Sequence, residues 1–298
     1  RRRWTQYWLK DPFSGALEFG LCHTLRLLSI EQCSAIGAWR GRYGAGEQRN
    51  LDRRARAAIA MLRPELRDTP QLDALLAQLR QNAGRTFLET LVNDRIDQSA
   101  RVQVADPVAL ERVLDRHPSV IFVAVHMANL GDTMGGALLK ATGRSGITVT
   151  RPFLNRFRQR LSNKLRQYQN GIVLPPGIGA TRQLLRHLQS PGTFVLLHLD
   201  EARGKQIHFP TFGRPIPRGS NLSIAIRLAA ASGVPLVPVH LQRHPGVRYT
   251  LHTCQPLHVP ADSNQEEQDV IATQLDRHFT DVIQKQLSDW LQLYYLRV

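Results

Sequence analysis

From about residue 101 onward, short apolar segments alternate with amphipathic segments of helical length, and this alternation constrains the fold most. We predict strands at 119–126, 146–153, 171–176, 192–200, 235–242 and 248–259. We predict helices at 106–116, 133–142, 154–169, 180–189, 220–232 and 264–290. Strands that alternate with helices are typical of a mostly parallel sheet with helices on both faces. The sequence therefore predicts an α/β fold with a mostly parallel central sheet.

The first hundred residues have a different pattern, in which apolar residues recur at helical spacing without strand-like runs. We predict helices at 13–39, 51–64 and 71–96. We therefore divide the chain into an N-terminal helical, membrane-proximal portion at 1–100 and an α/β core at 101–298, and expect the two to form one compact unit.

The charge balance indicates an anionic partner. Lys and Arg number 39 against 24 Asp and Glu, which gives a net charge of +15. Such a chain is attracted to phospholipid headgroups, phosphorylated or acidic substrates, an acidic carrier protein or nucleic acid, and charge alone does not choose among these. We do not expect nucleic-acid binding, because no recognised module is present and the arginines are not interleaved with stacking aromatics.

Aromatic and basic residues gather in the N-terminal portion. The aromatic residues are Trp4, Tyr7, Trp8 and Trp39, and the basic ones are Arg40, Arg42, Arg49, Arg53, Arg54, Arg56 and Arg63. Rings at headgroup depth and cations against anionic lipid would make an interfacial surface. The alternative is a solvated helical face with a few core aromatics. No run of 18 apolar residues exists, so we expect a peripheral protein, or one whose anchor lies outside this sequence.

The cysteines and histidines do not form a recognisable metal or disulfide pattern. The chain has three cysteines, scattered and without a CxxC pair, which favours a reducing compartment. Four histidines follow one another at positions 240, 244, 252 and 258, along predicted strands and turns and without metal-ligating companions. We expect structural or surface roles for them and no metal site.

The apolar run SVIFVAV ends on His126, and polar residues follow it. A histidine at the end of a buried strand is either a satisfied core residue or a general base suited to neutral pH. Asn129 would position a substrate or shape the turn. Asp132 would orient the imidazole, cap the following helix, or do both.

Two other predicted strand ends also carry charge, and ligands gather at the carboxyl ends of parallel strands. Arg151 follows ITVT near the end of one strand and precedes a basic helix, which suits contact with phosphate or with an acidic carrier. Asp200 and Glu201 end another strand, and Arg203, Phe212 and Arg218 follow them in a rigid, Pro-rich loop. The two acids would pair with these arginines, or Glu201 would partner His126. The sequence lacks G-x-S-x-G, GxxxxGK, HExxH and GxGxxG motifs.

Four segments in this order resemble the bacterial lipid A biosynthesis acyltransferase family, the late lauroyl/myristoyl transferases, within a wider glycerol-phosphate acyltransferase-like group. The segments are HMANLGD, TVTRPFLNRFRQRL, HLDEARGKQIHFPTFGRP and NLSIAIRLAAASGVPLVPVHL, and the resemblance runs from about residue 10 to the C-terminus.

The resemblance implies transfer of a fatty acyl group from an acyl-carrier-protein or coenzyme A thioester to a hydroxyl or amine of a lipid or glycolipid. It implies no cofactor besides the thioester substrate, and a location at the cytoplasmic face of the inner membrane. His126 would be the general base, and Arg151 or backbone N–H groups near the helix start would stabilise the oxyanion. The residues assigned to substrate binding are Asn129, Arg151, Asp200, Arg203, Phe212 and Arg218.

One departure from the family pattern concerns the acid that partners His126. The family usually has four residues between the histidine and the acid, whereas here five residues separate His126 from Asp132. We expect Asp132 or, failing that, Glu201 to be the partner. The irregular spacing also leaves an alternative function open, a non-catalytic protein that binds lipid or a carrier protein on the same scaffold.

Overall fold

The computed structural model describes residues 2–43, 49–128, 132–166, 171–204, 206–216 and 219–296. Within these residues, seven strands form one sheet in the order β1-β9-β8-β2-β5-β3-β4. Its strands are β1 (Val102–Val104), β2 (Ser119–Ala124), β3 (Ser145–Val149), β4 (Ile172–Leu174), β5 (Thr193–His198), β8 (Leu236–His244) and β9 (Arg248–Thr253). All neighbouring strands are parallel except β8 and β9, which form an antiparallel pair.

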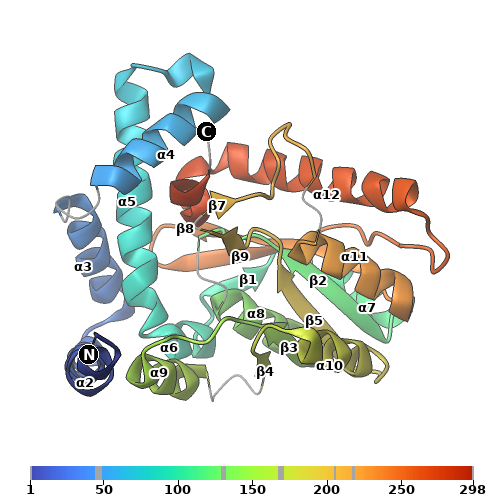
Figure 1. Ribbon diagram of the computed structural model, residues 1–298, viewed down its shortest axis with the longest axis horizontal. Helices are drawn as coiled ribbons and strands as arrows, with labels where there is room; N and C mark the ends of the chain where they lie inside the picture. Colours follow the sequence, from blue (N-terminus) through green and yellow to red (C-terminus); the bar gives the residue numbers. More distant parts are fainter. Residues whose placement is uncertain are drawn as a thin grey trace.

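Helices cover both faces of this sheet, which confirms the predicted α/β fold. One face packs against α7 (Pro107–Arg116) and α8 (Asp132–Thr142). The other packs against α10 (Ile178–Leu188), α11 (Asn221–Ser232) and α12 (Gln265–Lys285). In Figure 1, α12 lies along the top of the sheet and α8 below it.

Strand β2 lies in the middle of the sheet and shows why its sequence is an unbroken apolar run. All six of its residues are buried. Because successive side chains of a strand point to opposite faces, Val120 and Phe122 enter one core cluster and Ile121 and Val123 enter the other. A strand buried on both faces has no position for a polar side chain until it leaves the sheet.

The N-terminal portion is helical, as predicted, but the predicted helices 13–39 and 71–96 are each divided in two. Its helical elements are α1 (Arg2–Thr5), the π-helical turn η1 (Gln6–Lys10), α2 (Asp11–Leu25), α3 (Ile30–Tyr43), α4 (Arg49–Leu62), the 3₁₀ turn η2 (Pro64–Leu66), α5 (Pro70–Thr90) and α6 (Asn93–Gln98). The predicted helix 13–39 is interrupted by a turn after Leu25. Ser29 then starts α3 with a capping box, in which its hydroxyl accepts from Gln32 N–H and its own N–H donates to the Gln32 side chain.

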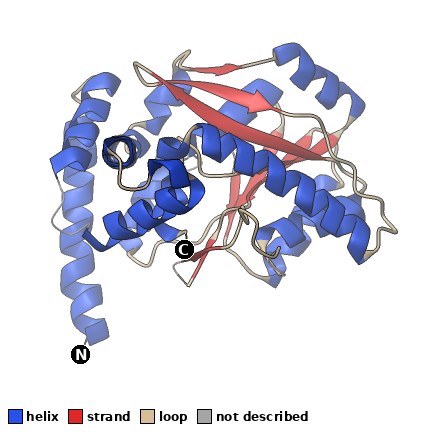
Figure 2. Cartoon of the chain, turned by 90° about the horizontal axis from the view of Figure 1, so that it is seen from above, coloured by secondary structure: helices blue, strands red, loops and turns tan. Residues whose placement is uncertain are grey.

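Close packing joins the N-terminal helices to one another and to the sheet. Helices α3 and α5 approach so closely that a Cβ added at Gly37 would lie 2.4 Å from the carbonyl oxygen of Gly84. Apolar residues of α5, among them Leu72 and Leu79, belong to the same core cluster as the α11–α12 face of the sheet. Figure 2 shows the N-terminal helices gathered beside one end of the sheet. The domain division at residue 100 stays a prediction.

The predicted helix 264–290 is too long, and its correction matters for the site. Helix α12 ends at Lys285, and two 3₁₀ turns follow, η4 (Leu287–Asp289) and η5 (Leu291–Tyr295). This tail runs beside the residues that follow β2, where Leu291 N–H donates to the His126 carbonyl at 3.3 Å. The C-terminal tail therefore forms one wall around the end of β2.

Several smaller elements also differ from the sequence predictions. Strands β3 and β9 end at Val149 and Thr253, earlier than predicted, and β1 was not predicted at all. The short antiparallel pair β6 (Ala202–Arg203) and β7 (Gln206–Ile207) was also missed. The remaining helix of the core, α9 (Arg156–Arg166), packs against α2. No helix among the described residues combines the length and apolarity needed to cross a bilayer.

Candidate active site

His126 and Asp200 meet because β2 and β5 are parallel neighbours in register. The pairing runs from Ser119 opposite Thr193 to Ala124 opposite His198. His126 and Asp200 each lie two residues beyond this last pair, with the same separation of 74 residues along the chain. The register of the two strands therefore continues past the sheet edge and places the imidazole against the carboxylate.

The Asp200 carboxylate is fully buried, at 0% exposure, and accepts three hydrogen bonds. Its Oδ1 atom lies 2.7 Å from Nδ1 of His126, and its Oδ2 atom accepts from the backbone N–H of His126 at 2.9 Å. Oδ2 also accepts from the indole Nε1–H of Trp290 at 2.9 Å. Because an ionised carboxylate only accepts hydrogen bonds, Nδ1 of His126 carries the proton in this contact.

This tautomer leaves Nε2 as the basic atom of His126. The side chain is 20% exposed, and Nε2 has no hydrogen-bond partner among the described residues. An imidazole whose one nitrogen is held by a buried carboxylate while the other is free has the arrangement of a general base.

The electrostatics of the pair favour charge on both partners. Burial alone would lower the pKa of His126, but the charge and hydrogen bond of Asp200, with a smaller contribution from Asp132, raise it above its usual value. Burial alone would raise the pKa of Asp200, but the neighbouring imidazole lowers it below its usual value. Asp200 is therefore ionised at neutral pH and increases the basicity of His126.

A second histidine stacks on His126. The ring of His198 lies 4.2 Å from that of His126, centroid to centroid, at an interplanar angle of 25°. Burial and the neighbouring imidazole lower the pKa of His198 to about 3, so this ring stays neutral. It therefore supports the His126 ring without adding a competing positive charge.

The predicted carboxylate partners of His126, Asp132 and Glu201, are not its hydrogen-bond partners in the structure. Asp132 begins α8, and its Oδ1 accepts from Nε of Arg166 at 2.8 Å. Glu201 accepts from the backbone N–H of Asn221 at the start of α11, at 2.9 Å. Asp200, assigned from sequence to substrate binding, takes the place expected for them. Glu201 instead stabilises a helix start, where negative charge is favourable.

The remaining predicted substrate-binding residues are spread over several places. Arg151 is exposed just beyond β3. The Phe212 ring packs 5.6 Å from that of Trp290, centroid to centroid, and so supports the tryptophan that holds Asp200. Asn129 and Arg218 lie outside the described residues, and so does the side chain of Arg203. Their assignment to substrate binding stays a prediction.

A buried network that sequence reasoning missed fixes the backbone after His126. Arg243 pairs with both oxygens of the fully buried Glu89, at 2.9 and 2.6 Å, and Tyr249 donates its hydroxyl to the same carboxylate at 2.5 Å. The same guanidinium donates to the carbonyl of Ala128 at 2.9 Å, and Thr86 donates to that carbonyl at 3.1 Å. We call these groups the Arg243 network.

The Arg243 network holds a strained position. Ala128 has φ +61°, which a residue with a Cβ rarely adopts, and its N–H donates to Asp289 of the C-terminal tail at 2.8 Å. Trp290, His198 and the Arg243 network carry no sequence signal that separates them from ordinary core residues, because their partners lie far away along the chain.

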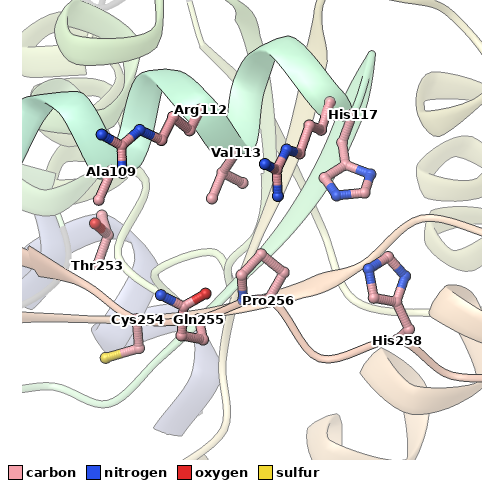
Figure 3. Close-up of a pocket in the computed structure, with 10 residues that line it drawn as sticks. Ala109, Arg112, Val113, His117, Thr253, Cys254, Gln255, Pro256 and His258 are labelled. Carbon is pink, nitrogen blue, oxygen red and sulfur yellow. The ribbon is translucent and has the colours of Figure 1, made fainter.

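A cavity at another place in the fold has a different character. It has a volume of about 360 Å³ and lies between α7 and the segment that follows β9. Figure 3 shows Arg112, His117, Cys254 and His258 at its wall. His126 is not among its lining residues, so this cavity is separate from the His126 pair.

The sequence was also compared with known proteins. The search of curated proteins gives no match. The sequence model for bacterial lipid A biosynthesis acyltransferases matches residues 2–296, nearly the whole chain. That match confirms the predicted resemblance. The chain belongs to the bacterial lipid A biosynthesis acyltransferase family and is therefore an acyltransferase that acts on lipid.

Proposed function

We propose that the protein transfers a fatty acyl group from an acyl thioester to a hydroxyl or amine of a lipid or glycolipid acceptor, with His126 as the general base. The observation that carries this proposal is the contact between Nδ1 of His126 and the buried Asp200 carboxylate, at 2.7 Å. It fixes the tautomer in which Nε2 accepts a proton. Asp200 acts as a positioning residue, because it acts through His126.

The reaction needs no enzyme nucleophile, because a thioester is already activated. Nε2 of His126 takes the proton from the acceptor O–H or N–H while that atom attacks the thioester carbonyl carbon. The tetrahedral oxyanion collapses, the C–S bond breaks, and the imidazolium returns the proton to the leaving thiolate. Backbone N–H groups at the start of α8, or Arg151, are our candidates for stabilising the oxyanion.

The basic residues beside β3 support an anionic donor, either acyl carrier protein or coenzyme A. Helix α9 carries five basic residues, and three of them contact side chains of other elements. Arg158 pairs with Glu18, Arg166 pairs with Asp132, and Arg156 lies over the ring of Tyr7. Arg160, Lys164 and the neighbouring Arg151 are exposed. These three cations form the docking surface that we propose for the phosphates or acidic face of the donor.

A second surface supports contact with a membrane. Exposed apolar side chains from the N-terminal helices lie close to α9, since α2 packs directly against it. Together with Phe153 and Leu154 from the segment before α9, we call them the apolar surface: Trp4, Tyr7, Trp8, Leu9, Phe13, Leu17, Phe153 and Leu154. Aromatic and aliphatic groups next to basic groups suit the interface of an anionic bilayer. We propose that this surface holds the enzyme at the cytoplasmic face of the inner membrane.

The test of the proposed function is turnover by His126→Ala. Acyl-thioester donors and candidate lipid acceptors are incubated with the protein, and the acylated product is measured by mass spectrometry. We expect the variant to lose roughly 10²- to 10⁴-fold in rate while keeping the wild-type melting temperature within a few degrees. His187→Ala, at a partly exposed histidine of α10, is the matched control and should retain full activity.

Full turnover by a folded His126→Ala variant would remove His126 from the mechanism. Donor and acceptor binding without turnover by the wild-type protein would favour the alternative, a non-catalytic lipid- or carrier-binding protein.

A further inference from the structure

A cluster of metal-ligating side chains lies where β8, the end of β9 and α12 meet. It consists of His240 on β8, Cys254 one residue beyond β9, and His278 on α12. One ligand atom from each residue lies within 4.8 Å of the other two. Because Val239 and Leu241 face the α7–α8 side, strand alternation places His240 on the opposite face, where α12 packs. The sequence predicted no metal-ligating companions for His240, and the structure corrects this.

Two features of the cluster are unusual for a packed core. Nδ1 of His240 is buried and has no hydrogen-bond partner among the described residues. Sγ of Cys254 lies 3.5 Å from Nε2 of His278. A buried polar atom without a partner is costly and calls for an explanation such as an unseen ion.

We propose that His240, Cys254 and His278 bind a divalent cation of the zinc class. Two imidazole nitrogens and one thiolate are ligands that Zn²⁺ prefers, and an exogenous ligand such as water would complete a tetrahedron. With ordinary Zn–N and Zn–S lengths, the N···S edge of such a tetrahedron is about 3.6 Å. The Cys254–His278 contact already has this length. The widest of the three separations, at most 4.8 Å, must shorten by up to about 1.2–1.5 Å when the cation binds.

The protonation states also suit a metal site. Burial, together with the neighbouring His252, His278 and Lys285, lowers the pKa of His240 to about 3. Burial also lowers the pKa of His278, with Lys285 adding to the effect and Asp281 opposing it. Both imidazoles are therefore neutral, as metal binding requires. Burial raises the pKa of the Cys254 thiol, so a bound cation must displace its proton, and binding releases one proton.

The place of the cluster in the fold gives the cation a structural role and a route of entry. The cation would link α12 to β8 and to the end of β9. Helix α12 is the element that precedes the tail with Asp289 and Trp290. Cys254 also borders the cavity beneath α7, and Figure 3 shows its sulfur pointing away from that helix. The cation would therefore reach the cluster past Cys254. This role is separate from proton transfer by His126, so the proposal does not depend on the acyl-transfer mechanism.

The experiment is a titration of the metal-free full chain with Co²⁺, followed by displacement with Zn²⁺. We expect one equivalent of Co²⁺ to give the absorption bands of a tetrahedral site with a thiolate ligand, and one equivalent of Zn²⁺ to remove them. Cys254→Ser should lose the thiolate band, and His278→Gln should weaken Zn²⁺ binding by more than about tenfold. Cys22→Ser and His187→Gln serve as controls for other thiols and histidines, and should behave like the wild type.

A second readout keeps the test independent of activity and of folding defects. Zn²⁺ should raise the melting temperature of the wild type and both controls, but not that of Cys254→Ser, with each variant first shown to be folded without metal. Absence of stoichiometric binding by the wild type would overturn the proposal. Equal binding by the wild type and Cys254→Ser would overturn it too.

Discussion

At the residue scale, His126 can be found from the sequence, but its partner cannot. An apolar run that stops on a histidine is visible in one segment. The partner depends on which strands are neighbours, and β5 lies beside β2 although β3 and β4 intervene in the chain. Judged by separation along the chain, Asp132 is the nearer acid. Once β2 and β5 are known to be neighbours, pairing their apolar runs residue by residue places Asp200 opposite His126.

Trp290 tests how strongly the fold depends on satisfying the Asp200 carboxylate. Trp290→Phe keeps a ring in the core but removes the indole N–H that donates to Asp200. Because a hydrogen bond to a buried charge is worth about 1.5–3 kcal/mol, we expect the free energy of unfolding to fall by about that amount. Urea denaturation measures it. Trp39→Phe, at an exposed ring, is the control and should change stability by less than about 0.5 kcal/mol.

An unchanged midpoint for Trp290→Phe would mean that the carboxylate does not need its third donor.

At the scale of elements, a helix boundary could be predicted where it has a local sequence signal. A boundary that depends on contacts with distant segments could not. The break before α3 has a local signal, the Ser29–Gln32 capping box, which sequence reasoning could have used. The end of α12 at Lys285 has none, because apolar residues continue at similar spacing into the tail. That tail leaves the helix to pack against the end of β2, and only the assembled sheet supplies this partner.

The Arg243 network connects β8 and α5 to the backbone beside His126, and it makes a prediction about stability. Arg243→Met would leave the Glu89 carboxylate buried without its cation. Breaking a buried ion pair on one side costs about 3–5 kcal/mol, so we expect a loss of that size in chemical denaturation. Arg56→Met breaks an exposed pair with Asp73 and should cost less than about 1 kcal/mol.

Equal effects of the two substitutions would show that the Arg243 network contributes no more than a surface pair. Reduced acyl transfer by a still-folded Arg243→Met protein would show that the network also positions the segment after His126.

At the scale of the whole molecule, the alternation of strands and helices was enough to predict the layered α/β fold. The strand order, the antiparallel β9 and the way α5 shares a core with the sheet depend on contacts between distant segments. The same limit applies to surfaces. The sequence indicated a basic and aromatic N-terminal region, and the structure places two of its exposed rings, Tyr7 and Trp8, next to α9.

The apolar surface predicts how the protein binds vesicles. Trp8→Ser combined with Phe13→Ser removes two exposed rings. Because burying apolar area in the bilayer contributes free energy in proportion to that area, we expect vesicle affinity to fall at least about tenfold. Co-sedimentation with vesicles that contain phosphatidylglycerol measures this, and added salt should weaken binding because the chain has a net charge of +15. Ile178→Ser, at an exposed apolar residue of α10, is the control and should bind like the wild type.

Equal binding by the double variant and the control, or equal binding to uncharged vesicles, would argue against this surface.

The central claim is that Asp200 orients the His126 ring and raises its pKa. The pH dependence of kcat/KM for Asp200→Asn tests this claim most directly. Asp200 raises the pKa of His126, and the base must be neutral to act, so activity is lost as pH falls through that pKa. Without the carboxylate charge, the acidic limb should move to lower pH, and the plateau should fall by roughly 10²- to 10⁴-fold. Asp132→Asn, whose charge contributes less, should shift the limb less in the same direction. An unmoved acidic limb in a folded Asp200→Asn enzyme, or a larger shift in Asp132→Asn, would contradict the claim.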